Sequence, residues 1–174
     1  NTFGGPLNID EGITRVTGNS ALGAITQGTT VLIGSQLQLQ GNLSIPDEPL
    51  HLNYGGLMVN PNQYDNTGAL RMINPTPGTP QTITWGSSGS AALVWADYNN
   101  YNVIAIDAPG DKFTINGVLN MQRALYKLGP GTLELAGTTN NVQGNNPVLY
   151  VSGGTLLLNK TNNAVAIPVN EYLY

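Results

Sequence analysis

The sequence predicts an all-β fold built as a β-solenoid, a parallel β-helix in which short strands recur at a fixed interval. The clearest copies lie between residues 126 and 159, where a corner glycine, Gly131 or Gly154, is followed by two leucines separated by one residue. These glycines are 23 residues apart, which is too long for a hairpin repeat and suits one coil of a solenoid. Gly12 and Ser35 occupy equivalent corners with the same spacing.

Composition supports short strands joined by tight turns. Charged residues make up 9% of the chain, against about 25% in ordinary soluble domains, and 22 residues are glycine. Glycine and the abundant asparagine tolerate the positive φ angles of tight corners, and the 11 prolines interrupt strands further. The length suits one domain with a sizeable core, so we expect a single solenoid domain over residues 1–174.

The first 40 residues contain five expected strands, at 7–9, 13–17, 24–26, 31–33 and 36–40. In the last of these, alternation directs Leu37 and Leu39 to the core and three glutamines to the other face. We expect the glutamines to form a solvated surface, with a laterally adhesive face as the alternative.

The repeat is less regular between residues 41 and 111, where seven of the prolines fall. Strands are expected at 50–53, 69–73, 82–85, 91–95 and 103–106, so longer loops leave the core in the middle third, where recognition sites are often found. Clear periodicity returns with strands at 112–115, 118–121, 125–128, 132–135, 148–151 and 155–159, and residues 164–169 start a further coil. The whole pattern corresponds to about six to eight coils, stacked as a rod.

Charge and residue types argue against several kinds of site. The net charge is −4 and the six basic residues are scattered, so no nucleic-acid surface is expected. No apolar run approaches the roughly 20 residues that cross a bilayer, so no membrane insertion is expected. There is no cysteine and one histidine, His51, and we expect no cofactor and no metal site, although the acidic pairs at 10–11 and 47–48 remain open to surface calcium.

Three carboxylates suggest a catalytic alternative. Asp97, Asp107 and Asp111 lie close together in the sequence, and two carboxylates about 5 to 10 Å apart can cleave a glycosidic bond. All three stand at turns, where aspartate serves backbone hydrogen bonding. We therefore expect no catalytic residues and no enzyme activity.

Aromatic residues concentrate in the middle of the chain. Exposed aromatic rings can stack on the apolar faces of sugars or contact a protein partner. The candidate glycan or partner contacts are Tyr54, Trp85, Trp95, Tyr98 and Tyr101.

Three stretches resemble the autotransporter-associated β-strand repeat, or passenger-associated transport repeat, of bacterial surface proteins. They are LGPGTLELAG at 128–137, VSGGTLLLN at 151–159 and NTFGGPLNIDEGITRVTGNSALG at 1–23. The resemblance implies a right-handed parallel β-helix, export, and an extracellular or cell-surface location in bacteria, and it implies no catalytic residues. The family's outer-membrane barrel segment is not found in this sequence.

The two ends of a solenoid expose unpaired strand edges, which invite further strands unless they are capped. The sequence offers no amphipathic helix at either end to act as a cap. We therefore expect a structural subunit that stacks head to tail, with copies of itself as partners, into an extracellular filament such as those of a biofilm matrix. The end contacts would be Asn1, Thr2, Phe3, Tyr172, Leu173 and Tyr174. The alternatives are an adhesin module whose loops bind a partner or a surface polysaccharide, and a polysaccharide-cleaving β-helix enzyme.

Overall fold

The computed structural model describes residues 3–53, 56–60, 63–64, 67–76, 78–90, 92–96, 101–144, 147–168 and 172–173. These residues form 20 strands and no helix, which confirms the predicted all-β class. The pairing is parallel throughout the three larger sheets, and the pair β7 (Met58–Asn60) and β8 (Gln63–Tyr64) is antiparallel.

The three parallel sheets contain six, seven and five strands. The six-stranded sheet has the order β1 (Leu7–Ile9), β3 (Thr29–Val31), β6 (Leu50–Leu52), β11 (Ala92–Ala96), β14 (Val118–Met121), β17 (Val142–Gln143). The seven-stranded sheet has the order β2 (Gly12–Val16), β4 (Ser35–Gln40), β9 (Leu70–Ile73), β12 (Tyr101–Ile106), β15 (Ala124–Leu128), β18 (Val148–Val151), β20 (Tyr172–Leu173). The five-stranded sheet has the order β5 (Leu43–Ile45), β10 (Thr82–Trp85), β13 (Lys112–Ile115), β16 (Thr132–Gly137), β19 (Thr155–Lys160).

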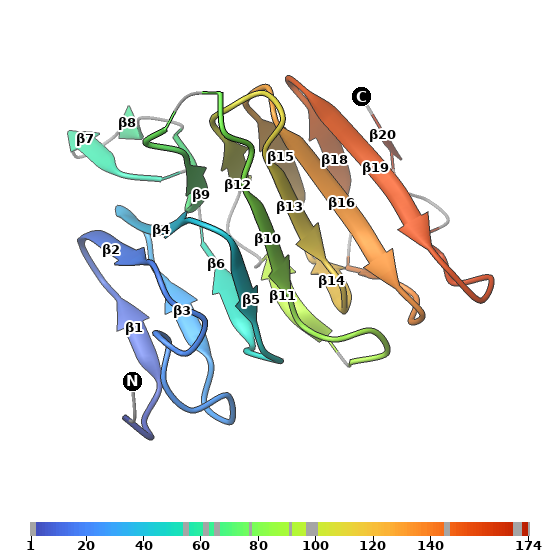
Figure 1. Cartoon of the computed structure of the whole chain (residues 1–174), viewed down its shortest axis with the longest axis horizontal. Coiled ribbons are helices and arrows are strands. Elements are labelled where there is room, and N and C mark those ends of the chain that lie inside the picture. The colour runs from blue at the N-terminus through green and yellow to red at the C-terminus, as the bar shows by residue number, and fades with distance from the viewer. Residues whose placement is uncertain are drawn as a thin grey trace.

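The chain visits the three sheets in turn. From β4 to β19, with the β7–β8 hairpin set aside, every third strand returns to the same sheet and pairs with the strand three before it. The strands follow one another along the long axis of the molecule, with the two ends of the chain at opposite extremes (Figure 1). The predicted 23-residue spacing is confirmed, because Gly12 pairs with Ser35 and Thr132 pairs with Thr155.

The core lies between the sheets and is formed by the inward side chains of the strands. Leu37, Leu39, Leu133 and Leu135 are fully buried, as the alternation predicts. Each buried leucine stabilises the fold by about 1.5–3 kcal/mol relative to an exposed one. Most of the buried hydrophobic residues form one cluster, which runs from Ile9 to Leu149.

The expectation of a glutamine surface is wrong. Gln36 and Gln38 are buried, because residues 67–68 contact Gln36, and Gln38 lies against Arg15 and Gln36. Gln36 Nε2 donates to Thr67 Oγ1 and to the Gly68 carbonyl, both at 2.8 Å. Gln38 Oε1 accepts from Arg15 Nε and Nη2 at 3.0 and 2.8 Å. These amides are therefore internal hydrogen-bonding groups and offer no adhesive face.

Several strand boundaries also differ from the expected ones. Residues 24–26 form a turn, and the described part of 164–169 is not a strand. The short strands β5, β7, β8, β17 and β20 have no counterpart among the expected ones. Each has only two or three residues, too few for alternation to reveal.

Candidate functional site

Three tyrosines stand side by side on the outer face of the seven-stranded sheet, and we call them the tyrosine row: Tyr101, Tyr126 and Tyr150. Tyr126 and Tyr150 are paired in register, and their rings are stacked with centroids 4.4 Å apart and an interplanar angle of 15°. The ring of Tyr101 meets Tyr126 edge to face at 5.6 Å and 75°. Tyr101 is the most open of the three, with 56% of its surface exposed.

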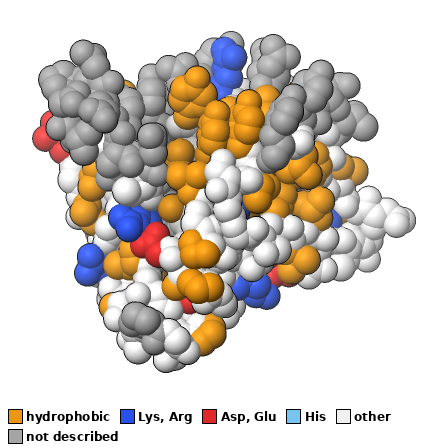
Figure 2. All heavy atoms as spheres, turned by 90° about the horizontal axis from the view of Figure 1, so that it is seen from above, with side chains coloured by type: hydrophobic (Ala, Val, Ile, Leu, Met, Phe, Trp, Pro, Cys, Tyr) orange, Lys and Arg blue, Asp and Glu red, His pale blue; other side chains and the backbone are white. Residues whose placement is uncertain are grey.

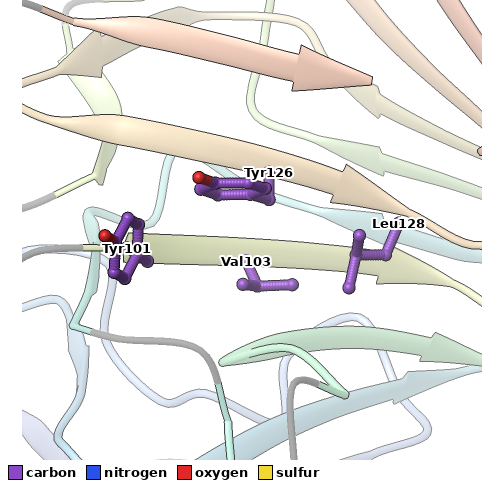
Figure 3. Close-up of a pocket in the computed structure, with 4 residues that line it drawn as sticks. All are labelled: Tyr101, Val103, Tyr126 and Leu128. Carbon is purple, nitrogen blue, oxygen red and sulfur yellow. The ribbon is translucent and has the colours of Figure 1, made fainter. Parts of the chain in front are cut away.

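A hollow of about 340 Å³ opens beside the tyrosine row and is lined by Tyr101, Val103, Tyr126 and Leu128. Figure 3 shows Val103 between the two tyrosines and Leu128, along β12 and β15. Val103 pairs with Tyr126 in register, so the smaller side chain leaves a gap where a third stacked ring would lie. Seen from above, a larger group of hydrophobic side chains lies in the upper middle of the view, and smaller groups occur elsewhere on this face (Figure 2).

The hydroxyl group of Tyr126 remains neutral in ordinary buffers. Burial raises the pKa of Tyr126, and the neighbouring hydroxyls of Tyr150 and Tyr101 raise that pKa further. The hollow therefore offers aromatic and aliphatic surface with phenol hydroxyls, and none of the described residues that line it is charged. Such a site suits a neutral ligand with an apolar face.

The structure places the predicted aromatic contacts in different environments. Tyr101 belongs to the tyrosine row, whereas Trp85 is fully buried in the core, where its Nε1 donates to the Glu48 carbonyl at 2.7 Å. Trp85 is thus unavailable to a ligand, which corrects its assignment as a contact. Tyr54 and Tyr98 lie outside the described residues, and Trp95 is placed in β11 without a described side chain.

Sequence reasoning missed Tyr126 and Tyr150. The signal was available, because both follow a leucine and precede a glycine by three residues, in the stretches LYKLG and LYVSG. Residues at equivalent positions of neighbouring coils become register partners in a parallel sheet.

A second candidate site is the free edge of β19. Among the described residues, β19 pairs on one side only, with β16. Leu156 and Leu158 continue the core rows of Leu133 and Leu135, yet Leu156 is only partly buried and Leu158 is 46% exposed. The core is therefore open at this edge.

The predicted end contacts are only partly described. Phe3 is half-buried beside the first strand, and Leu173 lies in β20 with 52% of its surface exposed. Tyr172 belongs to β20, although its side chain is not among those described. Asn1, Thr2 and Tyr174 lie outside the described residues.

The carboxylates that are described hold the structure together. Both carboxylate oxygens of Asp107 accept from Arg71 Nε, at 3.0 and 2.9 Å. Buried Asp111 accepts from the Asn74 side chain and from the Gln81 backbone amide. Asp97 lies outside the described residues. In the acidic pair at 47–48, Glu48 is buried against Thr29 Oγ1 at 2.8 Å and is not a surface ligand.

No group of three or more potential metal ligands occurs within the described ranges. The same part of the chain contains no helix that is long and apolar enough to span a bilayer. Comparison of the chain with protein-family models, with curated proteins and with solved structures finds no match in any of the three.

Proposed function

We propose that this chain is a right-handed β-solenoid and a structural subunit of a bacterial extracellular or cell-surface fibre, in which copies stack head to tail. Strand pairing at the open ends would join the copies. The resemblance of residues 1–23, 128–137 and 151–159 to the autotransporter-associated repeat supports the handedness and the location. The single observation that carries the proposal is the free edge of β19.

That edge combines two features that favour another strand. Its outer backbone groups have no described strand partner, and unpaired edges are templates for strand addition. Its inward leucines are partly exposed, although the same rows are fully buried one strand earlier. Covering both would gain up to about 1.5–3 kcal/mol for each leucine, in addition to the new backbone hydrogen bonds. Contacts of this head-to-tail kind do not close on themselves and so produce filaments.

Electron microscopy of the purified chain tests the proposal. We expect filaments of constant width whose length increases with protein concentration. Dispersed short rods at every concentration would contradict fibre formation and would favour the adhesin module instead. A Leu158→Lys variant, which places a charge on the open core, should yield only short rods even where the unchanged chain forms filaments.

The tyrosine row favours a second function, binding of a neutral surface polysaccharide. The described residues that line its hollow are uncharged and include two aromatic rings, and sugar rings present apolar faces to such surfaces. Retention on immobilised neutral polysaccharides should fall with Tyr101→Ala and Tyr126→Ala. The control variant Leu157→Ala changes a residue of the five-stranded sheet and should be retained like the unchanged chain. Equal retention of all variants would remove this function.

A further inference from the structure

The two edges of the five-stranded sheet differ in what covers them. At the β5 edge, residues 18–27 lie alongside the strand, since Asn19 Oδ1 accepts a hydrogen bond from the Ser44 amide at 2.9 Å. Leu22 from this segment is buried in the core cluster. At the β19 edge no described segment plays this part. The sheet is therefore covered at its N-terminal edge and open at its C-terminal edge.

The segment that precedes β1 forms the next layer outward at the covered edge. The Phe3 carbonyl accepts from the Ala24 amide at 3.0 Å, and the Leu7 amide donates to the Gly28 carbonyl at 3.1 Å. Residues 3–7 therefore run beside residues 24–28. The Phe3 ring lies against Gly23, where φ is +87° and an added Cβ would come within 2.6 Å of the ring. Glycine at this position allows the ring to lie over the end of the molecule.

The segment before β1 occupies the place in its coil that β5, β10 and β13 of the five-stranded sheet occupy before β6, β11 and β14. Leu7 belongs to the same row as Leu119, through the successive pairs Leu7–Thr29, Thr29–Leu50, Leu50–Val94 and Val94–Leu119. Ile115 precedes Leu119 by four residues and belongs to the row Ile45–Trp85–Ile115–Leu135–Leu158, in which Ile45 precedes Leu50 by five. Phe3 precedes Leu7 by the same four residues. Phe3 is the large apolar residue of the segment 3–6, so it is the candidate in this segment to meet Leu158.

We propose that the free edge of β19 pairs in parallel with the segment before β1 of a second copy, and that the Phe3 ring of that copy covers Leu158. This pairing rests on the proposed fibre function and specifies its interface. Two half-buried apolar groups at opposite ends of the molecule then bury each other, and the core row continues from one copy into the next.

Cysteine pairs test the register, because the chain contains no cysteine. Directly opposed residues on neighbouring strands lie about 4.8 Å apart, which is within the range that a disulfide spans. Phe3→Cys combined with Leu158→Cys should give a ladder of covalent multimers on mild oxidation. The control combines Phe3→Cys with Leu157→Cys, whose side chain points to the opposite face, and should give far fewer. Figure 1 shows β19 and the N-terminal end at opposite ends of the molecule, so each bond must join two copies.

Three outcomes are decisive. Multimers from the 3/158 pair but not from the 3/157 pair support the pairing. Filaments in which both pairs cross-link equally, or neither does, overturn the pairing and leave the fibre function standing. Failure of the unchanged chain to form filaments overturns both. A peptide of residues 1–9 gives a second test without substitutions in the chain: it should shorten the filaments, and its Phe3→Lys version should not. Equal effects of the two peptides would also overturn the pairing.

Discussion

Leu135 and Leu158 are register partners on neighbouring strands, and Leu135 is fully buried whereas Leu158 is 46% exposed. Their side chains point into the same core row, so the difference arises from what lies beyond each strand. Beyond β16 lies β19, and beyond β19 no described strand follows. Under the proposed function, this row continues into another copy of the chain.

Leu158→Lys should abolish assembly while leaving the folded subunit nearly as stable as before. Leu158 is already half exposed, and the lysine ammonium can reach water at the open edge. Leu157→Lys is the matched control, because Leu157 is similarly exposed but points to the opposite face. Sedimentation and urea unfolding of both variants provide the comparison. Equal loss of assembly in the two would show that charge alone, and not the core row, is responsible.

Gly154→Ala should destabilise the fold more than Gly12→Ala does, although both glycines occupy corners of the same repeat. Both have positive φ, 65° and 74°, so each alanine bears a backbone strain of about 1–2 kcal/mol. A Cβ at Gly12 would meet open space, whereas one at Gly154 would collide with the carbonyls of Gly129 and Gly131. Urea unfolding measures the difference. Equal losses would mean that the coils are not packed as closely at this corner.

The free energy of unfolding should rise with pH between about pH 8 and pH 10.5 because of Lys127. It occupies a core position in register with Ile104, and its Nζ donates to the carbonyls of Leu128, Gly129 and Gly153. Burial lowers the pKa of Lys127 to about 8, from 10.5. Within this window the unfolded chain binds more protons than the folded one, so stability rises with pH, by about 1–3 kcal/mol.

Urea unfolding across this pH range tests that prediction. Lys127→Met should reduce the rise, and Lys160→Met should reduce it further, because burial lowers the pKa of Lys160 to about 8 as well. A rise of unchanged size in Lys127→Met would show that Lys127 titrates normally in the folded chain.

Glu134 should contribute stability that is lost in acid. Burial alone would raise its pKa, but hydrogen bonds from Lys112, Asn159 and Thr114, at 2.7 to 2.8 Å, and the charge of Lys112 bring the pKa below the usual 4.5. The contribution is present above pH 4.5 and disappears as the pH falls towards the folded-state pKa.

Glu134→Gln should cost about 1–3 kcal/mol at pH 7 and should flatten the loss of stability between pH 5 and pH 3. Urea midpoints measured at half-unit pH steps give both quantities. If the acid loss keeps its slope in this variant, other carboxylates account for it.

The fold was predictable where the alternation is long and the corner is marked. The pairs Gly12–Ser35 and Thr132–Thr155 follow from spacing alone. The covered glutamines were not predictable, because the segment over Gln36 comes from Thr67 and Gly68, about 30 residues away. Nothing in a six-residue alternation reveals what will lie on its outer face.

The tyrosine row was only partly predictable, for a similar reason. Exposure of Trp85 was a wrong expectation that alternation could have corrected, since Ile83 and Trp85 share a face of β10 and both are buried. Tyr101 was predicted as a contact because it lies in the part of the sequence where aromatic residues concentrate. The hollow beside it depends on Val103 pairing with Tyr126, so its existence requires the register of two strands and the difference in size between two side chains.

Hydrogen exchange at β19 tests the central claim most directly. The Thr155 and Thr161 amides donate to Gly131 and Gly137 across the β16 side, so alternation directs the Leu156 and Leu158 amides to the free edge. In dispersed subunits these two amides should exchange quickly while that of Leu157 is protected. In assembled material we expect all three to be equally slow. Rapid exchange of Leu156 and Leu158 in assembled material would contradict the claim that another copy completes this edge.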